Sequence, residues 1–151
     1  MPAMAAAALH HVHGLVTGSY RKTVAAFAVV TDDHDRVLMV RNAIGTRVWN
    51  LPGGRVERHE RPHEGVVREV LEETGFEVAV DRLAVVDAAR AESVVLTFRC
   101  SVVGGGARPG PGEIVLLRWT TDEELEREPE RRRRTIRLAR TAGPAEVHYL
   151  G

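Results

Sequence analysis

Three glutamates stand within five residues of one another in segment 66–76, VVREVLEETGF: Glu69, Glu72 and Glu73. If the segment is a helix, with about 100° per residue, the three side chains share one arc of its surface. Glu69 and Glu73 then form an i,i+4 pair of like charges, just before a helix end where basic residues are preferred. Such local violations are typical of functional sites. Converging carboxylates without His or Cys favour a hard cation such as Mg²⁺ or Mn²⁺.

The alternative interpretation is an acidic helix face that is simply solvated, as most runs of charge are. The position at the helix end and the Gly-rich approach 51–54, LPGG, favour the cation site. Arg68 stands four residues before Glu72 and could hold that carboxylate in place. An open magnesium site that also takes water and substrate phosphates indicates phosphate chemistry.

The segment that carries the glutamates is predicted to be an amphipathic helix between Pro62 and Gly75. Proline is tolerated in the first helical turn, and glycine supplies a left-handed residue at the C-terminal end. The apolar stripe, which we expect to pack inward, comprises Val66, Val67, Val70 and Leu71.

Apolar runs on both sides of this helix predict strands, and we expect them to form the sheet that positions it. The expected elements are a β-hairpin at 21–42 around the turn 32–35, two or three strands at 77–105, a strand at 113–120, a helix from Thr121, and a segment 129–140 that extends this helix or forms a third. No repeat or interdomain linker is evident. We therefore expect one domain over residues 21–151, preceded by a flexible arm, residues 1–20.

The composition indicates a globular protein: 44% of the 151 residues are hydrophobic. Its 21 basic and 21 acidic residues balance, so no global field favours nucleic acid. Cys100 is the only cysteine, which excludes an internal disulfide and a multi-cysteine zinc site. Neither a secretion signal nor a membrane span is apparent. We expect a cytoplasmic protein, a monomer or homodimer, with no nucleic-acid or membrane partner.

The glutamates belong to a longer pattern: Gly54, Glu60, Arg68-Glu69-Val70, Glu72-Glu73 and Gly75-Phe76. Their types and spacing resemble the complete signature of the Nudix hydrolases. All nine positions of that signature are filled over 23 residues. The strands before the signature and the strand and acidic helix after it lie where the family has them. The resemblance leaves out residues 1–20 and about 130–151.

The resemblance implies an α+β fold: the Nudix fold, an α/β/α sandwich with a mixed β-sheet. It implies hydrolysis of a nucleoside diphosphate linked to another group, with a small-molecule nucleotide as substrate and Mg²⁺ or Mn²⁺ as cofactor. By position in the signature, the implied metal ligands are Glu69, Glu72, Glu73 and the carbonyl oxygen of Gly53.

The resemblance also implies roles for the neighbouring residues. Glu60 braces the loop or holds a water, and Arg68 orients the glutamates. One glutamate takes the proton of the attacking water as general base. We expect this to be Glu69, with Glu72 and Glu113 as the alternatives.

Three positions depart from residues that are usual in the family. His59 stands where Gly is frequent, although His tolerates a left-handed backbone. Arg61 stands where Ser or Thr often caps the helix, and its side chain cannot cap in that way. Gly65 stands where Ala is usual and lowers helix propensity by up to about 1 kcal/mol. None removes a metal ligand, but all three predict a looser loop and an altered rate.

Four residues outside the signature are candidates for substrate or metal contacts. Trp49 and Trp119 could stack on a nucleobase, although packing in the core is the commoner role. Arg41 follows a strand and could contact phosphate or base, or be an ordinary exposed residue. Glu113 is a further candidate metal ligand or base, or simply the first residue of a strand.

Two clusters of like residues can each be interpreted as a binding site or as an ordinary surface feature. His10, His11 and His13 could bind a transition metal, but a flexible His-rich arm is the preferred interpretation. The run 131–134, RRRR, could attract phosphate or RNA. Since Glu126, Glu128 and Glu130 precede it, a solvated face is preferred.

The substrate class rests on what the chain lacks after Gly75. The chain lacks the proline that ADP-ribose-type members of the family tend to have about 15 residues after this glycine. It also lacks the tyrosine that dinucleoside polyphosphate hydrolases have in this region. This favours a (deoxy)nucleoside triphosphate or an oxidised nucleotide, with ADP-ribose and nucleotide sugars still open. Two other classes are a nucleotide-sensing module without catalysis and a diphosphate isomerase that would need Cys100 as a catalytic residue.

Overall fold

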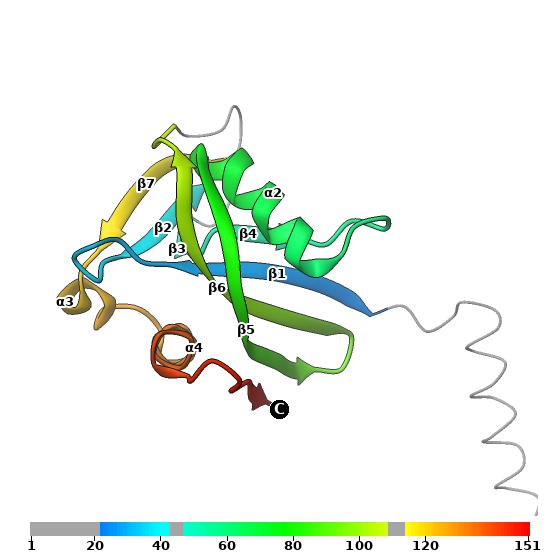
Figure 1. The fold of residues 1–151 in the computed structure, drawn as a ribbon. Helices are drawn as coiled ribbons and strands as arrows, with labels where there is room; N and C mark the ends of the chain where they lie inside the picture. Colours follow the sequence, from blue (N-terminus) through cyan, green and yellow to red (C-terminus); the bar gives the residue numbers. More distant parts are fainter. Residues whose placement is uncertain (1–21, 43–46, 109–113) are drawn as a thin grey trace, which may run out of the picture.

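The computed structural model describes residues 22–42, 47–108 and 114–151 (Figure 1). Its elements in chain order are β1 (Thr23–Val30), β2 (Val37–Asn42), β3 (Trp49–Asn50), β4 (Gly53–Arg55), α2 (Pro62–Thr74), β5 (Phe76–Arg90), β6 (Ser93–Gly105), β7 (Ile114–Thr120), α3 (Asp122–Leu125), α4 (Glu130–Thr141) and β8 (His148–Leu150). The predicted helix and the strands that follow it are therefore present.

The strands form a five-stranded sheet in the order β4-β1-β6-β5-β8 and a three-stranded sheet in the order β3-β2-β7. The larger sheet is mixed: β1 runs parallel to β6 and antiparallel to β4, whereas β5 runs antiparallel to β6 and parallel to β8. In the register of β1 and β4, Phe27 lies opposite Gly53. This pairing places the Gly-rich approach to α2 at the edge of the larger sheet.

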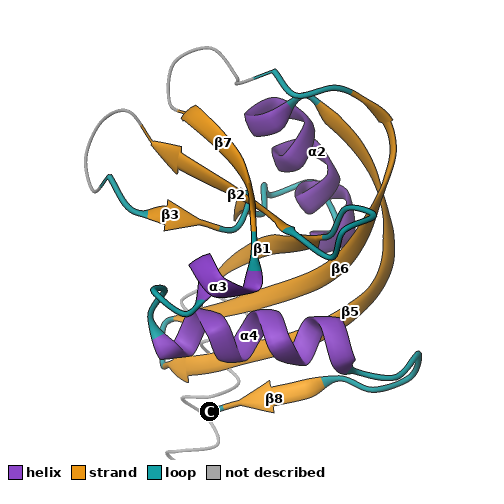
Figure 2. Ribbon diagram, turned by 90° about the vertical axis from the view of Figure 1, so that its left-hand side faces the viewer, coloured by secondary structure: helices purple, strands orange, loops and turns teal. Residues whose placement is uncertain are grey.

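Alternation along β1 divides the core into two layers. Ala28 and Val30 belong to the cluster that contains Val66 and Val70 of α2. Val29, between them, belongs to the cluster that contains α4, because successive strand residues point to opposite faces. Fully burying a valine of this kind contributes about 1.5–3 kcal/mol. Helix α2 thus covers one face and α4 the other, which confirms the α/β/α sandwich with a mixed sheet (Figures 1 and 2).

Helix α4 is tied to the larger sheet at its C-terminal end. Arg82 of β5 donates a hydrogen bond of 2.8 Å to the carbonyl of Ala139, and Arg99 of β6 donates one of 2.8 Å to the carbonyl of Arg140. These carbonyls carry the negative end of the helix dipole, so positive partners stabilise them.

The arginine run at the start of α4 is held by acidic neighbours. Arg132 pairs with Glu128, Arg133 with Glu126 and Glu130. Arg131 pairs with Asp87 of β5. The prediction that the preceding glutamates offset this run is confirmed.

Two predictions about local structure are wrong. Residues 23–42 of the predicted hairpin, 21–42, form two strands and a turn but not a hairpin: outside one bridge between Thr31 and Val37, β1 and β2 pair in different sheets. Strand β2 pairs instead with β7, almost 80 residues later in the chain. Leu71 was expected on the buried stripe of α2, but it is 45% exposed, whereas Val66 and Val70 are fully buried.

The segment after β7 contains two separate helices. Thr121 caps α3, accepting a hydrogen bond from the backbone of Glu124, as its position in the sequence predicted. Helix α4 begins after Pro129 and does not continue α3. In the part of the chain that the structure describes, no helix is both long enough and apolar enough to cross a membrane.

Candidate active site

A capping hydrogen bond and a left-handed glycine define where helix α2 begins and ends, and so fix the positions of its glutamates. The backbone N–H of Arg61 donates a hydrogen bond of 2.8 Å to Glu64, so Glu64 supplies the cap that the Arg61 side chain cannot. The helix ends at Gly75, whose φ of 77° is left-handed as predicted. His59 is not among the described residues with positive φ, so its position does not require glycine.

Arg68 joins three carboxylates of the site. It donates hydrogen bonds of 3.0 Å and 2.7 Å to the two oxygens of Glu60. From Nη1 it donates further bonds of 3.2 Å to Glu69 and 3.0 Å to Glu72. Glu60 in turn accepts a bond of 2.8 Å from the backbone N–H of Glu57. The planar guanidinium therefore links the loop before α2 to the glutamates on the helix.

Two glycines admit carboxylates that a larger residue would displace. A Cβ at Gly54 would come within 2.6 Å of the Glu69 carboxylate, and one at Gly65 within 2.8 Å of Glu60. Gly65 was expected only to weaken the helix. The structure gives it a positive role, because its missing side chain leaves room for the Glu60 carboxylate beside Arg68.

Glu73 contacts strand β4. Its Oε2 accepts a hydrogen bond of 2.9 Å from the backbone N–H of Gly53, on β4. This bond fixes the Gly53 peptide against the C-terminal part of α2. The predicted ligands Gly53 and Glu73 are thus in contact, although 20 residues separate them in the chain.

The three acidic side chains around Arg68 differ in how far they are buried. Burial raises the pKa of Glu69 above its ordinary value, against the opposing effect of Arg68. The hydrogen bonds from Arg68 hold the pKa of Glu60 below its ordinary value, and the same contacts raise the pKa of Arg68. The Glu69 side chain is 19% exposed and that of Glu72 is 58% exposed. Glu69 is therefore the less exposed of the two carboxylates.

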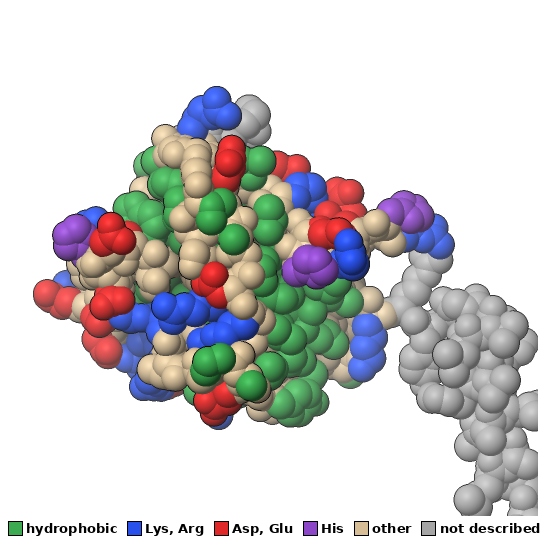
Figure 3. Space-filling model, in the orientation of Figure 1, with side chains coloured by type: hydrophobic (Ala, Val, Ile, Leu, Met, Phe, Trp, Pro, Cys, Tyr) green, Lys and Arg blue, Asp and Glu red, His purple; other side chains and the backbone are tan. Residues whose placement is uncertain are grey.

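The donor set suits a hard divalent cation. Glu60, Glu69 and Glu72 share the one positive charge of Arg68, so this group of carboxylates remains negative overall. Their oxygens are turned onto the arginine, and within the described residues no three His, Cys, Asp or Glu side chains are gathered as a metal-holding group. All the available donors are oxygens, the type that Mg²⁺ and Mn²⁺ prefer. On the face shown in Figure 3, acidic and basic side chains are interspersed with hydrophobic ones.

The two tryptophans lie on opposite faces of the three-stranded sheet. Trp119 pairs with Leu38, packs against the α2 cluster and contacts the ring of Phe76 at a centroid distance of 5.6 Å. Trp49 pairs with Arg41 and packs against the α4 cluster. Residues paired across two strands share a face of the sheet, whereas residues 38 and 41 of β2 point to opposite faces. Their partners Trp119 and Trp49 therefore also point to opposite faces, and the two rings cannot line one side of a bound base together.

The Trp49 ring is bordered by two cations. The guanidinium of Arg41 lies 5.9 Å from the ring centroid and that of Arg118 lies 4.2 Å from it, which is cation–π contact. Arg118 also pairs with Glu128, at the entry to α4. Trp49 and Arg41 are thus brought together, as the interpretation of both as substrate-binding residues requires.

A pocket of about 410 Å³ opens on the α4 face beside this region. Phe27, which lies opposite Gly53, lines it together with Asn50 and Leu51. Asp87 and Arg131 line its far side. These residues were not predicted from the sequence. The stretch WNLPGG contains Asn50 and Leu51 and offered a signal for them, whereas Phe27 and Asp87 could be found only from the register of the sheet.

Glu113, His10, His11 and His13 lie outside the described residues. Cys100 is buried in the α2 cluster, and this burial raises the pKa of its thiol to about 12. A thiol of that pKa stays protonated and makes a poor nucleophile or acid at neutral pH.

Comparison with known proteins agrees with this architecture. The family model described as NUDIX domain matches residues 21–139. A "MutT-like protein" of Streptomyces ambofaciens is 39% identical over 104 residues, 68% of this chain and 66% of that protein. A protein of Bacillus subtilis (strain 168) named "Putative 8-oxo-dGTP diphosphatase" is 33% identical over 104 residues, 68% of this chain and 69% of that protein. The match thus spans about two thirds of each relative.

A solved structure shares the fold. The crystal structure of an ADP-ribose pyrophosphatase from Streptococcus suis superposes with a TM-score of 0.70 at 20% sequence identity. The superposition covers 84% of this chain and 98% of that one. Helices packed on a mixed sheet are therefore common to both.

Proposed function

Since the chain belongs to the Nudix hydrolase family, we propose that it hydrolyses a (deoxy)nucleoside triphosphate or an oxidised nucleotide with the help of Mg²⁺ or Mn²⁺. The observation that carries the proposal is the contact of one guanidinium, that of Arg68, with Glu60, Glu69 and Glu72 beside the Gly53–Gly54 backbone. The relative named "Putative 8-oxo-dGTP diphosphatase" supports the same substrate class.

Glu69, Glu72, Glu73 and the Gly53 carbonyl are the residues that would hold the metal, with Glu113 as a further carboxylate. The metal would supply positive charge to the diphosphate and make a water molecule more acidic. Arg68 and Glu60 keep the glutamates in place. Glu69 takes the proton of the attacking water as general base, a role to which its burial and raised pKa suit it. Glu72 and Glu113 remain the alternatives.

The pocket beside Gly53 is the proposed site for the nucleoside. Its wall includes Asn50, a donor and acceptor suited to a base edge, and the apolar side chains of Phe27 and Leu51. Strand β4 is the edge strand of the larger sheet, so a nucleotide can extend around it to α2. Trp49 and Arg41 lie on the same side of the molecule as this pocket and could extend the contact. Trp119 faces the other side of the three-stranded sheet. A contact of Trp119 with the substrate would therefore be separate from the contacts of Trp49 and Arg41.

A panel of nucleotides tests the proposal. The purified protein is incubated with Mg²⁺ and with canonical and oxidised nucleoside triphosphates, ADP-ribose and nucleotide sugars, and released phosphate or pyrophosphate is measured. Preferred cleavage of a triphosphate to the monophosphate and pyrophosphate supports the proposal. Preferred cleavage of ADP-ribose or a sugar nucleotide would reassign the substrate. Tight binding without any cleavage would favour a sensing module.

A matched pair of variants connects the activity to the site. Glu69→Gln should lower turnover of every substrate, whereas Glu123→Gln, at an exposed position on α3, should not.

An isomerase based on Cys100 is tested by Cys100→Ala. We expect this variant to retain nucleotide hydrolysis, because the thiol is buried and protonated.

A further inference from the structure

The five-stranded sheet carries apolar side chains that point to the same face as α2 but lie beside this helix. Ala26 of β1 is in the α2 cluster and pairs with Leu96 of β6, which packs against that cluster. Two residues earlier on the same strands, Val24 pairs with Val94, so alternation turns this pair to the face of α2. Val86 of β5 pairs with Leu96 and therefore shares the same face.

These valines are not part of either core of the described residues. Val24, Val86 and Val94 belong to neither hydrophobic cluster and are half-buried. Tyr149 of β8, which pairs with Val86, is 70% exposed. We call these four residues the open face. In Figure 3, hydrophobic side chains form a continuous area at the lower right, where Figure 1 shows β1, β5 and β6 extending beyond α2. Continuous apolar areas of this kind mark surfaces that another element covers.

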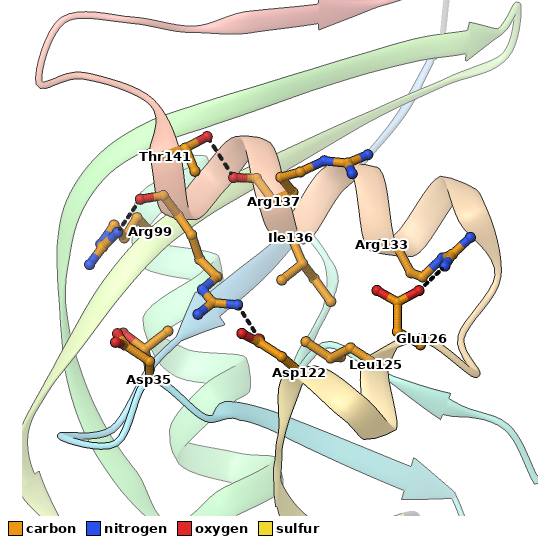
Figure 4. Close-up of a pocket in the computed structure, with 11 residues that line it drawn as sticks. Asp35, Arg99, Asp122, Leu125, Glu126, Arg133, Ile136, Arg137 and Thr141 are labelled. Carbon is orange, nitrogen blue, oxygen red and sulfur yellow. Dashed lines mark hydrogen bonds and ion pairs between the residues drawn. The ribbon is translucent and has the colours of Figure 1, made fainter.

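The opposite face of the sheet is covered by α4. The pocket of about 470 Å³ between α3 and α4 is bordered by charged side chains that pair with one another, Asp122 with Arg140 and Glu126 with Arg133 (Figure 4). Ion pairs therefore satisfy these groups locally, whereas the open face leaves apolar side chains in contact with water.

The chain arrives at the open face from its N-terminal side. Lys22 directly precedes β1, and with Val24 it lines a hollow of about 980 Å³ between the start of β1 and the loop before α2. Residues 1–20 therefore join the molecule at the border of the open face. They lie outside the described residues and before the match to the family model, which begins at residue 21. A contact of this segment would thus be a feature of this chain and not of the matched domain.

The composition of this segment is that of a segment that packs. Residues 1–20 contain no Lys, Arg, Asp or Glu, whereas solvated segments are usually rich in charge and poor in apolar residues. With about 100° per residue, the larger apolar side chains share a helical arc of about 140°, and the three histidines lie outside it. The residues of this apolar arc are Met4, Leu9, Val12, Leu15 and Val16. This is the pattern of an amphipathic helix.

The dimensions of such a helix suit the open face. Pro2 and Gly18 are residue types favoured at the two ends of a helix, and residues 3–17 between them would be about 22 Å long. Strands β1, β6, β5 and β8 are neighbours, which at about 4.8 Å spacing makes the face about 14 Å wide. Residues 18–21 can span up to about 13 Å to Lys22. A helix this short that contains Gly14 is marginal alone in water, so its stability depends on packing.

We propose that residues 3–17 form an amphipathic helix that docks on the open face through its apolar arc, with the histidines turned to solvent. The sequence favoured a flexible arm here, and the open face is the observation that changes this expectation. Attachment at Lys22 keeps the segment at a high effective concentration beside the face, which favours it over a second copy of the chain.

Hydrogen exchange of the full chain, followed by mass spectrometry, tests the proposal. The amides of residues 3–17 should exchange roughly tenfold or more slowly in the wild type than in Leu15→Asp, which places a charge on the apolar arc. Thr17→Asp adds the same charge near the same helix end, but on the side of the histidines, and should keep the slow exchange. Tyr149→Asp, at an exposed position of the open face, should speed exchange in residues 3–17 without any change to their own sequence.

Three results would overturn the proposal. One is exchange of residues 3–17 in the wild type as fast as in Leu15→Asp, which would indicate a solvated arm. The second is unchanged slow exchange in Tyr149→Asp, which would place the helix elsewhere. The third comes from sedimentation of the same proteins: a wild-type dimer that Tyr149→Asp dissociates would identify a second copy as the occupant of the open face.

Discussion

The backbone N–H of Gly53 donates a 2.9 Å hydrogen bond to the carboxylate of Glu73, across 20 residues of sequence. This bond joins β4 to α2 and holds two of the proposed metal ligands, Gly53 and Glu73, in contact. Glu73 therefore has two roles to test: the position of the Gly53 peptide, and the charge that it would present to a cation.

Glu73→Gln separates these roles. The amide oxygen of Gln can still accept the bond from Gly53, so the melting temperature should change little. The charge is lost, and we expect turnover to fall by about 100-fold or more, the scale of one lost electrostatic contact at an active site. Steady-state hydrolysis of the preferred nucleotide and thermal unfolding measure the two effects. A wild-type rate in this variant would remove Glu73 from the metal site.

Arg68→Lys tests the shared guanidinium. Lysine keeps the charge but cannot reach Glu60, Glu69 and Glu72 together with a planar set of donors. We expect a loss of about 1–2 kcal/mol in stability, or roughly 3–6 °C in melting temperature, and lower activity. The matched control is Arg61→Lys, since Arg61 is 74% exposed and contacts only Glu64 among the described acids. Equal effects of the two changes would contradict a special role for Arg68.

Divalent metal should raise the melting temperature. At a concentration 100-fold above its Kd, a ligand that binds only the folded state stabilises it by about 2.7 kcal/mol. Calorimetry with and without Mg²⁺ or Mn²⁺ measures this shift. It should be reduced in a Glu69→Gln, Glu72→Gln double variant and retained in Glu123→Gln. A wild type that shows neither a shift nor metal binding would argue against the proposed cofactor.

The pair between Asp87 and Arg131 should make stability depend on pH. Burial alone would raise the pKa of Asp87, but the hydrogen bonds from Arg131 outweigh it and leave the pKa below its ordinary value of 3.8. A lowered folded-state pKa stabilises the protein above the unfolded-state pKa, and this contribution is lost as pH falls through the folded-state value. Asp87→Asn should therefore cost about 1 kcal/mol at neutral pH, and this cost should shrink as the pH falls. Unfolding in urea from pH 7 to pH 2.5 measures the difference. The change Asp33→Asn, at an exposed turn residue, should show no such trend.

Hydrolysis should proceed by direct attack of water. With Cys100 buried and protonated, and carboxylates at the site, no covalent enzyme intermediate is expected. A single turnover in ¹⁸O-labelled water should therefore place one label in a product phosphate and none in the enzyme. Isolation of a phosphoryl- or nucleotidyl-enzyme would contradict this mechanism.

The parts of the fold that could be predicted from sequence are those with local causes. Pro62, Gly75 and the valine spacing define α2, because helix ends and periodicity depend on neighbouring residues. The hairpin prediction for 21–42 failed because the choice of partner for β2 depends on β7, which the local pattern does not contain. The prediction that Leu71 is buried was wrong for a similar reason, since the exposure of this side chain depends on what packs against α2.

The same limit applies to the candidate site. The contact of Arg68 with Glu72 follows from i,i+4 spacing and was expected. The contacts of Arg68 with Glu60 and of Glu73 with Gly53 bring loop and strand against the helix, and spacing alone cannot give their geometry. The separation of Trp49 from Trp119 likewise depends on strand register, which residue type does not reveal.

The anchoring of α4 by Arg82 and Arg99 has a consequence for how the chain unfolds. Both arginines come from the long β5–β6 hairpin, and the Nη1 of Arg82 is buried without a partner among the described residues. Detachment of α4 would remove the carbonyl acceptors of both half-buried guanidinium groups. We therefore expect that the helix does not fray independently and that its amide protons exchange with solvent in the same cooperative event as those of the hairpin.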